Sequence, residues 1–279
     1  MRIDTLSQRG SLVDIGQGPA IVLVPGAQGR WEWMADTVEA LARHFRVLTF
    51  TLAGERTSGQ AFDPRLGFDN FIVQLDRVFE AAALRDAIVC GVSYGGPVAL
   101  RYAALRPERV RELVLVSAVG PAYRPDPRTR MYLRAPRLLA PVFVVRGVAR
   151  TWREVARAIP SGRGRLAFVA RYAVRVARAP ITPRLMRDRV RLLTELDTET
   201  AARSISAPTL IVTGDPGFDP VVRVESTLAY RDLLRNVQVA RLEHTGHLGI
   251  VLHPDAFTSI VKDFVDRAEA GPFDDRRTG

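Results

Sequence analysis

Cysteine, lysine and long apolar runs are scarce or absent in this sequence. One cysteine, Cys90, occurs in 279 residues, so an internal disulfide is excluded. The four histidines show no spacing typical of metal ligands, and we expect neither a metal centre nor a cofactor. No run of 18 apolar residues occurs, so no membrane-spanning helix is predicted. Residues 1–7 lack the apolar core of a signal peptide, and we therefore expect a cytoplasmic protein.

Positive charge is concentrated in one segment. Lys262 is the sole lysine, and residues 121–205 contain 19 arginines against six acidic residues, a net charge of +13. The remainder of the chain has a net charge of −3. Basic segments often bind nucleic acid, but no recognition motif and no platform of aromatic side chains accompanies this one. We therefore expect no nucleic-acid partner.

The same segment has an amphipathic pattern. Arg171, Arg175 and Arg178 recur at helical spacing among apolar residues and are expected to share one face. An apolar stretch at 138–145, broken by Pro141, precedes them. The pattern resembles a basic lid that rests on anionic lipid or captures an acidic substrate. A lid exposed only to water, whose arginines extend from an apolar underside, also fits.

Apolar, β-rich segments alternate with helical patterns along the chain. Residues 2–15 are predicted to form an antiparallel hairpin. Further strands are expected at 20–25, 46–51, 86–91, 110–117, 207–213 and 237–242, and helices at 31–43, 68–84, 94–105, 222–234 and 255–268. Within 120–204, helices are expected at 165–178, at 187–202 and in part of 131–158. This alternation predicts an α/β protein with a mostly parallel sheet and helices on both faces.

A Gly-x-Ser-x-Gly motif lies between a predicted strand and a predicted helix. Gly91, Ser93 and Gly95 carry it, after the apolar stretch 86–90 and before the apolar stretch 97–104. A strand that turns so sharply into a helix exposes the serine hydroxyl and leaves no room for side chains at the two glycines. The helix directs its free N–H groups at the same spot. The motif therefore predicts a nucleophile beside an anion-stabilising site.

Two later loops contain candidate partners for the serine. His247 follows the strand predicted at 237–242 and precedes the final helix, with His244 as an alternative in the same loop. Asp219 and Asp215 both follow the strand predicted at 207–213. All of these loops fall at the carboxyl ends of parallel strands, where active sites of such sheets lie. The loop sequences Thr-Gly-His-Leu-Gly and Asp-Pro-Val-Val bear on these two choices through the family resemblance described next, which favours His247 and Asp219.

Taken with the order serine, aspartate, histidine, these motifs resemble the α/β-hydrolase superfamily. The resemblance covers residues 1–119 and 205–270 as a core, with 120–204 as a helical cap and 271–279 as a frayed tail. It implies that Ser93 is the nucleophile, His247 the base and Asp219 the orienting acid. The backbone N–H groups of Ala27 and Tyr94 would form the oxyanion hole, although Pro25 stands where relatives usually have histidine.

The resemblance implies hydrolysis of a small carboxylic ester through an acyl-enzyme. Relatives with the same triad cleave lactones, amides and carbon–carbon bonds; Leu248, where carbon–carbon hydrolases often have tryptophan, weakens the last option. A ligand receptor without turnover is the alternative from another class. Trp31 and Trp33 either pack in the core or form a wall of the acyl pocket. Serine at position 93 excludes chemistry that requires an aspartate nucleophile there.

Overall fold

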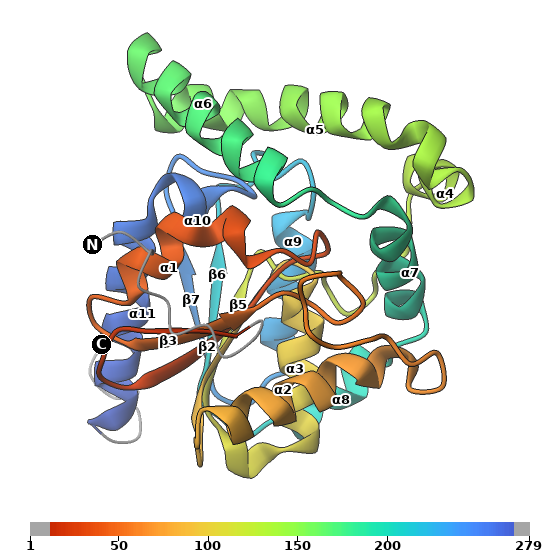
Figure 1. Ribbon diagram of the computed structural model, residues 1–279. Helices are drawn as coiled ribbons and strands as arrows, with labels where there is room; N and C mark the ends of the chain where they lie inside the picture. The colour runs from red at the N-terminus through yellow and green to blue at the C-terminus, as the bar shows by residue number, and fades with distance from the viewer. Residues whose placement is uncertain (1–11, 271–279) are drawn as a thin grey trace.

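The computed structural model describes residues 12–270 and contains one seven-stranded sheet with helices on both faces (Figure 1). The strand order is β1-β3-β2-β4-β5-β6-β7. Only β1 runs antiparallel to its neighbour, and every other pairing is parallel. The strands are β1 (Leu12–Ile15), β2 (Ala20–Val24), β3 (Arg46–Phe50), β4 (Ala87–Val92), β5 (Val110–Val116), β6 (Thr209–Thr213) and β7 (Val237–Arg241). The predicted α/β architecture is thereby confirmed.

Most of the N-terminal hairpin predicted at residues 2–15 lies outside the described part of the chain. Residues 1–11 lie outside the described part of the chain, as does the tail 271–279. The described part, β1, pairs antiparallel with β3, so that Leu12 lies opposite Phe50.

Helices α1 (Ala35–Leu41) and α11 (Pro254–Glu269) cover one face of the sheet, and α2 (Asn70–Ala81), α3 (Gly95–Leu105) and α8 (Thr198–Ser204) cover the other (Figure 1). Two short helices, α9 (Val224–Leu228) and α10 (Gly249–Leu252), follow β6 and β7. They lie outside the segment between β5 and β6, which we call the insertion. Two predicted helices are shorter than expected. The helix expected at 31–43 begins as a 3₁₀ turn at Trp31–Met34, and the one at 222–234 ends as a 3₁₀ turn at Ala229–Asp232.

The five inner strands, β2–β6, are buried on both sides, which explains their continuous apolar runs. β4 is buried throughout, and it contains Cys90, whose thiol has a pKa raised by burial. An apolar environment that disfavours the thiolate makes this cysteine unreactive.

The segment between β5 and β6 is helical. It contains α4 (Pro127–Arg134), α5 (Pro136–Ala158), α6 (Gly162–Arg178), α7 (Pro183–Thr194) and α8. The side chains of Asp126, Ser161 and Asp197 cap α4, α6 and α8 by accepting backbone N–H groups. The single helix expected at 187–202 is wrong, because the cap at Asp197 starts α8 after a break at 195–197.

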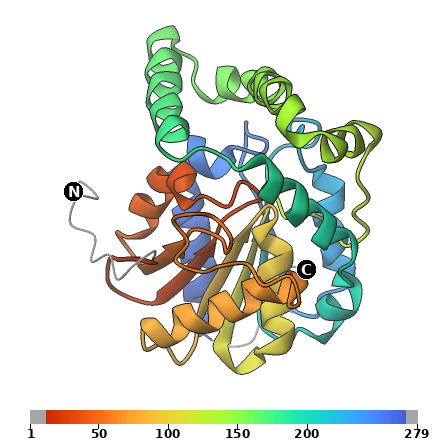
Figure 2. The same ribbon diagram turned by 45° about the vertical axis from the view of Figure 1, so that its right-hand side comes forward.

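Helices α4–α7 lie beyond the carboxyl ends of the parallel strands (Figures 1 and 2). α6 contacts the turn at Trp31–Met34, and α7 contacts the turn at Gly67–Asp69. The division of the chain into a core domain and a cap domain stays a prediction. Within residues 12–270, no helix combines the length and hydrophobicity needed to cross a membrane.

Arg171 and Arg175 lie on one face of α6, as their helical spacing predicted, and both contact the same acidic side chain on α1. Arg175 turns toward the core and pairs with Asp36 on α1, through Nη1 to Oδ2 at 2.6 Å, and only 19% of its side chain is exposed. Arg171 Nη2 lies 3.5 Å from the same carboxylate. An available acidic partner on the core therefore takes two of the three arginines.

Candidate active site

Ser93 lies in the turn between β4 and α3. Its backbone is left-handed, with φ of 55°, a conformation that costs free energy for any residue but glycine. Its N–H donates to the carbonyl oxygen of Val116 at 2.8 Å, and its carbonyl accepts the N–H of Gly96 at 3.0 Å. A Cβ at Gly91 would lie 2.2 Å from the oxygen of Gly95. The motif glycines are therefore required by close packing, as predicted.

The candidate oxyanion loop packs against this turn. A Cβ at Gly95 would lie 2.3 Å from the carbonyl oxygen of Val24, so the loop after β2 directly adjoins the serine turn. The loop is closed by a hydrogen bond from Gly29 N–H to the Gly26 carbonyl at 2.8 Å. Within the described residues, neither Ala27 N–H nor Tyr94 N–H donates a hydrogen bond to another group. Both are available for a ligand, and their assignment to an oxyanion hole stays a prediction.

The buried ring of Tyr94 fixes its backbone. Its centroid lies 5.8 Å from that of Phe68 and 5.7 Å from that of Phe71. Aromatic contacts of this kind hold the first turn of α3 in place.

His247 and Asp219 form a hydrogen-bonded pair. Nδ1 of His247 lies 2.9 Å from Oδ2 of Asp219. Oδ1 of Asp219 accepts the N–H groups of Val221 and Val222, each at 2.8 Å. An ionised carboxylate only accepts, so Nδ1 carries the imidazole proton and Nε2 is left as the basic nitrogen. The Asp219 side chain is 1% exposed and cannot rotate away from these donors without losing them.

Tight packing of the two loops brings this pair together. A Cβ at Gly246 would lie 2.3 Å from the carbonyl oxygen of Phe218, immediately before Asp219. A Cβ at Gly214 would lie 2.5 Å from the carbonyl oxygen of Thr245. Glycine at both positions lets the histidine loop lie directly on the aspartate loop.

The alternative residues belong to a different cluster. Asp215 accepts the N–H of His244 at 2.8 Å and lies within 4 Å of Arg157 and Arg241. His244 is exposed, and its Nδ1 lies 3.3 Å from Nε of Arg157. The structure therefore places these two residues in a surface ion-pair group, and it is Asp219 that contacts His247.

The charge around His247 favours its protonated form. Burial lowers the pKa of His247, but the negative charge of Asp219, the hydrogen bond to it and the charge of Glu154 together raise it above the ordinary value. An imidazole of this kind is a good proton acceptor at neutral pH. Within residues 12–270, no group of three or more His, Cys, Asp or Glu side chains is placed to bind a metal ion.

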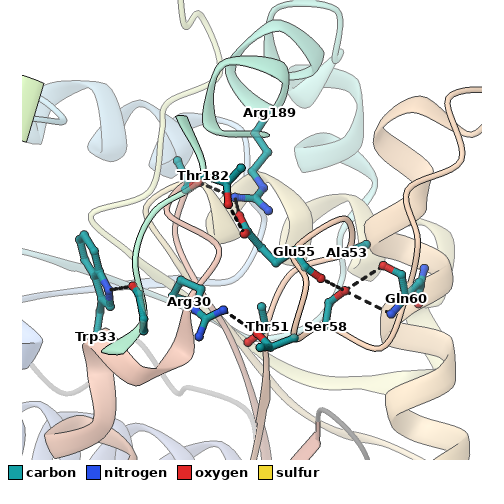
Figure 3. Close-up of polar contacts among 12 residues, drawn as sticks. Arg30, Trp33, Thr51, Ala53, Glu55, Ser58, Gln60, Thr182 and Arg189 are labelled. Atoms are coloured by element: carbon teal, nitrogen blue, oxygen red, sulfur yellow. Dashed lines mark hydrogen bonds and ion pairs between the residues drawn. The ribbon is translucent and has the colours of Figure 1, made fainter. Parts of the chain in front are cut away.

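Two charged residues that the sequence analysis did not single out contact the site loops. One is Arg189 on α7, whose Nη1 donates to the carbonyl oxygen of Ala27 at 2.9 Å and lies 3.0 Å from Oε1 of Glu55 (Figure 3). Thr182 donates its hydroxyl to Oε2 of Glu55 at 2.7 Å. The side chains of Arg189 and Glu55 are each 3% exposed, so this pair is an internal clamp on the loop that contains Ala27.

The other is Glu154 on α5. Its carboxylate accepts backbone N–H groups on both sides of His247. Nothing in the sequence pattern marks Glu154 or Arg189, because each lies about 90 to 160 residues from its partners and belongs to no local motif.

The two tryptophans lie between the sheet and the insertion. Trp33 donates its indole N–H to the carbonyl oxygen of Ala179 at 2.9 Å (Figure 3). Its ring also packs edge-on against Tyr172 on α6. Trp31 is half-buried against the apolar cluster that contains Met34. A role of either in binding substrate stays a prediction.

Comparisons with known proteins agree with the observed fold. A family model described as alpha/beta hydrolase fold matches residues 19–254. The chain is 30% identical to polyketide synthase ThaQ of Burkholderia thailandensis over 94% of its own length, but it spans only 13% of that synthase. It is 26% identical to a pimeloyl-[acyl-carrier protein] methyl ester esterase of Nitrosospira multiformis, over 90% of this chain and 95% of the esterase.

A solved structure, the enol-lactonase from Burkholderia xenovorans, matches with a TM-score of 0.74 and 19% identity, over 91% of this chain and 95% of the lactonase. At that identity the match shows a shared fold. With the family model covering most of its length, the chain belongs to the alpha/beta hydrolase fold family.

Proposed function

We propose that the protein is a serine hydrolase that cleaves a small carboxylic ester through an acyl-enzyme on Ser93. The observation that supports this most directly is the 2.9 Å contact of His247 with Asp219, together with a serine held in a left-handed turn at the same edge of the sheet. A base oriented by a buried carboxylate and a nucleophile on a strained turn are the parts that acyl transfer requires.

The reaction starts with proton transfer from Ser93 Oγ to Nε2 of His247. The oxygen attacks the ester carbonyl carbon, and the negative charge that develops on the carbonyl oxygen is stabilised by the N–H groups of Ala27 and Tyr94. The carbon–oxygen bond to the alcohol breaks, and His247 returns the proton to the leaving alcohol. Water, activated by His247, then attacks the acyl-enzyme, which releases the acid and restores Ser93.

Asp219 holds the imidazole in the tautomer that these reaction steps need. Its carboxylate binds the Nδ1 proton, so Nε2 is free to accept one, and its charge stabilises the imidazolium formed during the attack. The esterase name of the Nitrosospira relative supports an ester as the substrate, and 26% identity leaves the acyl group undetermined.

A fluorophosphonate probe tests the proposal. The wild-type protein should be labelled covalently, and Ser93→Ala should abolish labelling while leaving the fold intact by circular dichroism. A panel of p-nitrophenyl esters of increasing chain length then measures turnover and acyl preference. Absence of both labelling and turnover would favour a hydrolase-fold receptor, and labelling without ester turnover would redirect the search to lactones and amides.

A further inference from the structure

Glu154 connects the helical insertion to the histidine loop. It lies in α5 and is 1% exposed. Its Oε1 accepts the N–H of Gly246 at 2.6 Å and the N–H of Leu248 at 2.8 Å. These two N–H groups flank His247, so one carboxylate oxygen holds the backbone on both sides of the histidine.

The loop has few other ways to satisfy these groups. Gly246 lies against the backbone of Phe218 and Asp219, where not even a methyl group fits. The N–H of Gly246 is buried and that of Leu248 is part-buried, and a buried N–H group left without an acceptor destabilises the fold. The shape of the His247 loop therefore depends on a side chain that comes from the insertion.

Among residues with described side chains, His247 is the group whose positive charge acts on Glu154. Within the described residues, no arginine or lysine forms an ion pair with Glu154, and its Oε2 has no hydrogen-bond partner. The arginines nearest to it on its own helix turn elsewhere: Arg153 and Arg157 stack on the ring of Phe218, and Arg157 also reaches Asp215 and His244.

Asp219, in the loop after β6, repels Glu154, and the apolar cluster that contains the next residue, Val155, includes Phe168 and Tyr172 of α6. Burial, as the largest effect, raises the pKa of Glu154 to about 7; the N–H groups of Gly246 and Leu248 and the charge of His247 act in the opposite direction. Glu154 therefore gains its negative charge as the pH rises through about 7.

We propose that Glu154 is a positioning residue for His247: it shapes the histidine loop from the insertion and supplies a second negative charge, besides Asp219, that favours the imidazolium. The inference rests on the proposed function for its catalytic meaning, but its two physical parts, hydrogen bonding and charge, are separable by substitution. Glutamine at this position can still accept both N–H groups and lacks the charge. Alanine lacks both.

The experiment compares Glu154→Gln, Glu154→Ala and the control Glu195→Gln, which removes an exposed carboxyl from the same insertion. The first readout is the dependence of kcat/KM on pH for a p-nitrophenyl ester. The second is an NMR titration of the His247 imidazole, identified by its loss in His247→Gln, which needs no turnover. Fluorophosphonate labelling of the wild type checks the proposed function independently.

Glu154→Gln should lower the titration midpoint of His247, and the acid limb of kcat/KM with it, by about one pH unit, as expected for loss of one nearby opposite charge. Glu154→Ala should in addition reduce kcat at the pH plateau by roughly ten- to a hundredfold, because the histidine is no longer held in place. Glu195→Gln should change neither readout.

An unchanged His247 midpoint in Glu154→Gln overturns the charge part, and a plateau kcat in Glu154→Ala equal to wild type overturns the positioning part. If Glu154→Ala does not fold, the Glu154→Gln titration still decides. If the wild type is not labelled but the midpoint of His247 falls in Glu154→Gln, the proposed function has failed and the coupling of Glu154 to His247 stands.

Discussion

Asp219 and Asp215 are neighbouring carboxyls in one loop with different environments. Asp219 receives two backbone N–H groups and the imidazole, whereas Asp215 lies among surface arginines. Asp219→Asn should reduce kcat roughly 10³–10⁴-fold, because an amide favours the wrong histidine tautomer. Asp215→Asn is the matched control and should change kcat little. The reverse ranking of the two variants would assign the acid to Asp215.

The raised pKa of His247 predicts the direction of the pH dependence. The neutral imidazole is the active base, so kcat/KM should rise with pH and reach a plateau once His247 is deprotonated. Since Asp219 and Glu154 outweigh the effect of burial, the midpoint should lie above about 6.5, the ordinary histidine value. In Asp219→Asn the midpoint should fall. A profile that is flat between pH 5 and 9, with chemistry rate-limiting, would exclude a histidine base.

At this scale the sequence predicts residues that belong to short motifs. Ser93 and its glycines follow from the turn they must form, and the positions of His247 and Asp219 follow from strand ends. Glu154 and Arg189 were not predicted, because neither spacing nor composition relates a residue of the insertion to a loop that is far away in the sequence. The spacing of Arg171 and Arg175 predicted a shared face of α6 but not its partner Asp36, because helical periodicity does not identify what lies opposite a face.

The elements of the insertion are attached to the core by buried polar contacts. The Arg189–Glu55 pair joins α7 to the loop after β3 and to Ala27. Arg189→Met should reduce the free energy of unfolding by about 3–5 kcal/mol, because it leaves Glu55 buried without a cation. Combining it with Glu55→Leu should recover part of that loss, since no unpaired charge remains.

Urea denaturation of both variants measures this, with Arg191→Met as the control because Arg191 is exposed on the same helix. Equal destabilisation by Arg189→Met and Arg191→Met would show that the clamp contributes nothing. Loss of ester turnover in a still-folded Arg189→Met variant would indicate that the Ala27 loop needs the clamp for its shape.

Strands were easier to predict than helices. Strands β2–β6 are apolar runs buried on both faces and bounded by turn residues, and these five and the edge strand β7 lie where expected. Helix boundaries depend on caps and breaks: Asp197 begins a new helix inside a stretch that has continuous helical periodicity. The pairing of β1 with β3 depends on contacts between distant residues, which no local pattern encodes.

At the scale of the whole molecule, exposed apolar side chains and positive charge are both concentrated in the insertion. Of the eleven large apolar side chains that are exposed among those the structure describes, seven lie in α4–α6, namely Met131, Leu138, Val142, Trp152, Leu166, Val169 and Val174. Even with Arg175 turned inward, the insertion is strongly basic. We expect the protein to sediment with anionic vesicles at low salt and to be released at high salt, because the attraction between exposed charges is screened.

Replacing Leu166 and Val174 by serine should weaken this binding, whereas the same replacement at Leu105 and Val239, which are exposed outside the insertion, should not. Neutral vesicles should bind less. A protein that stays in the supernatant at low salt has no membrane contact of this kind, and its arginines would then have to be examined for substrate selection.

The place of the insertion has an evolutionary consequence. It leaves the sheet after β5 and returns at β6, and these strands are hydrogen-bonded neighbours, with Val116 opposite Val212. A segment that departs from one strand and re-enters at the next can be lengthened, shortened or exchanged without altering the strand order. Because Glu154 and Arg189 contact the histidine and Ala27 loops, however, a newly acquired segment must bring equivalent contacts. Insertion and core loops are thus expected to be inherited together, as matched pairs.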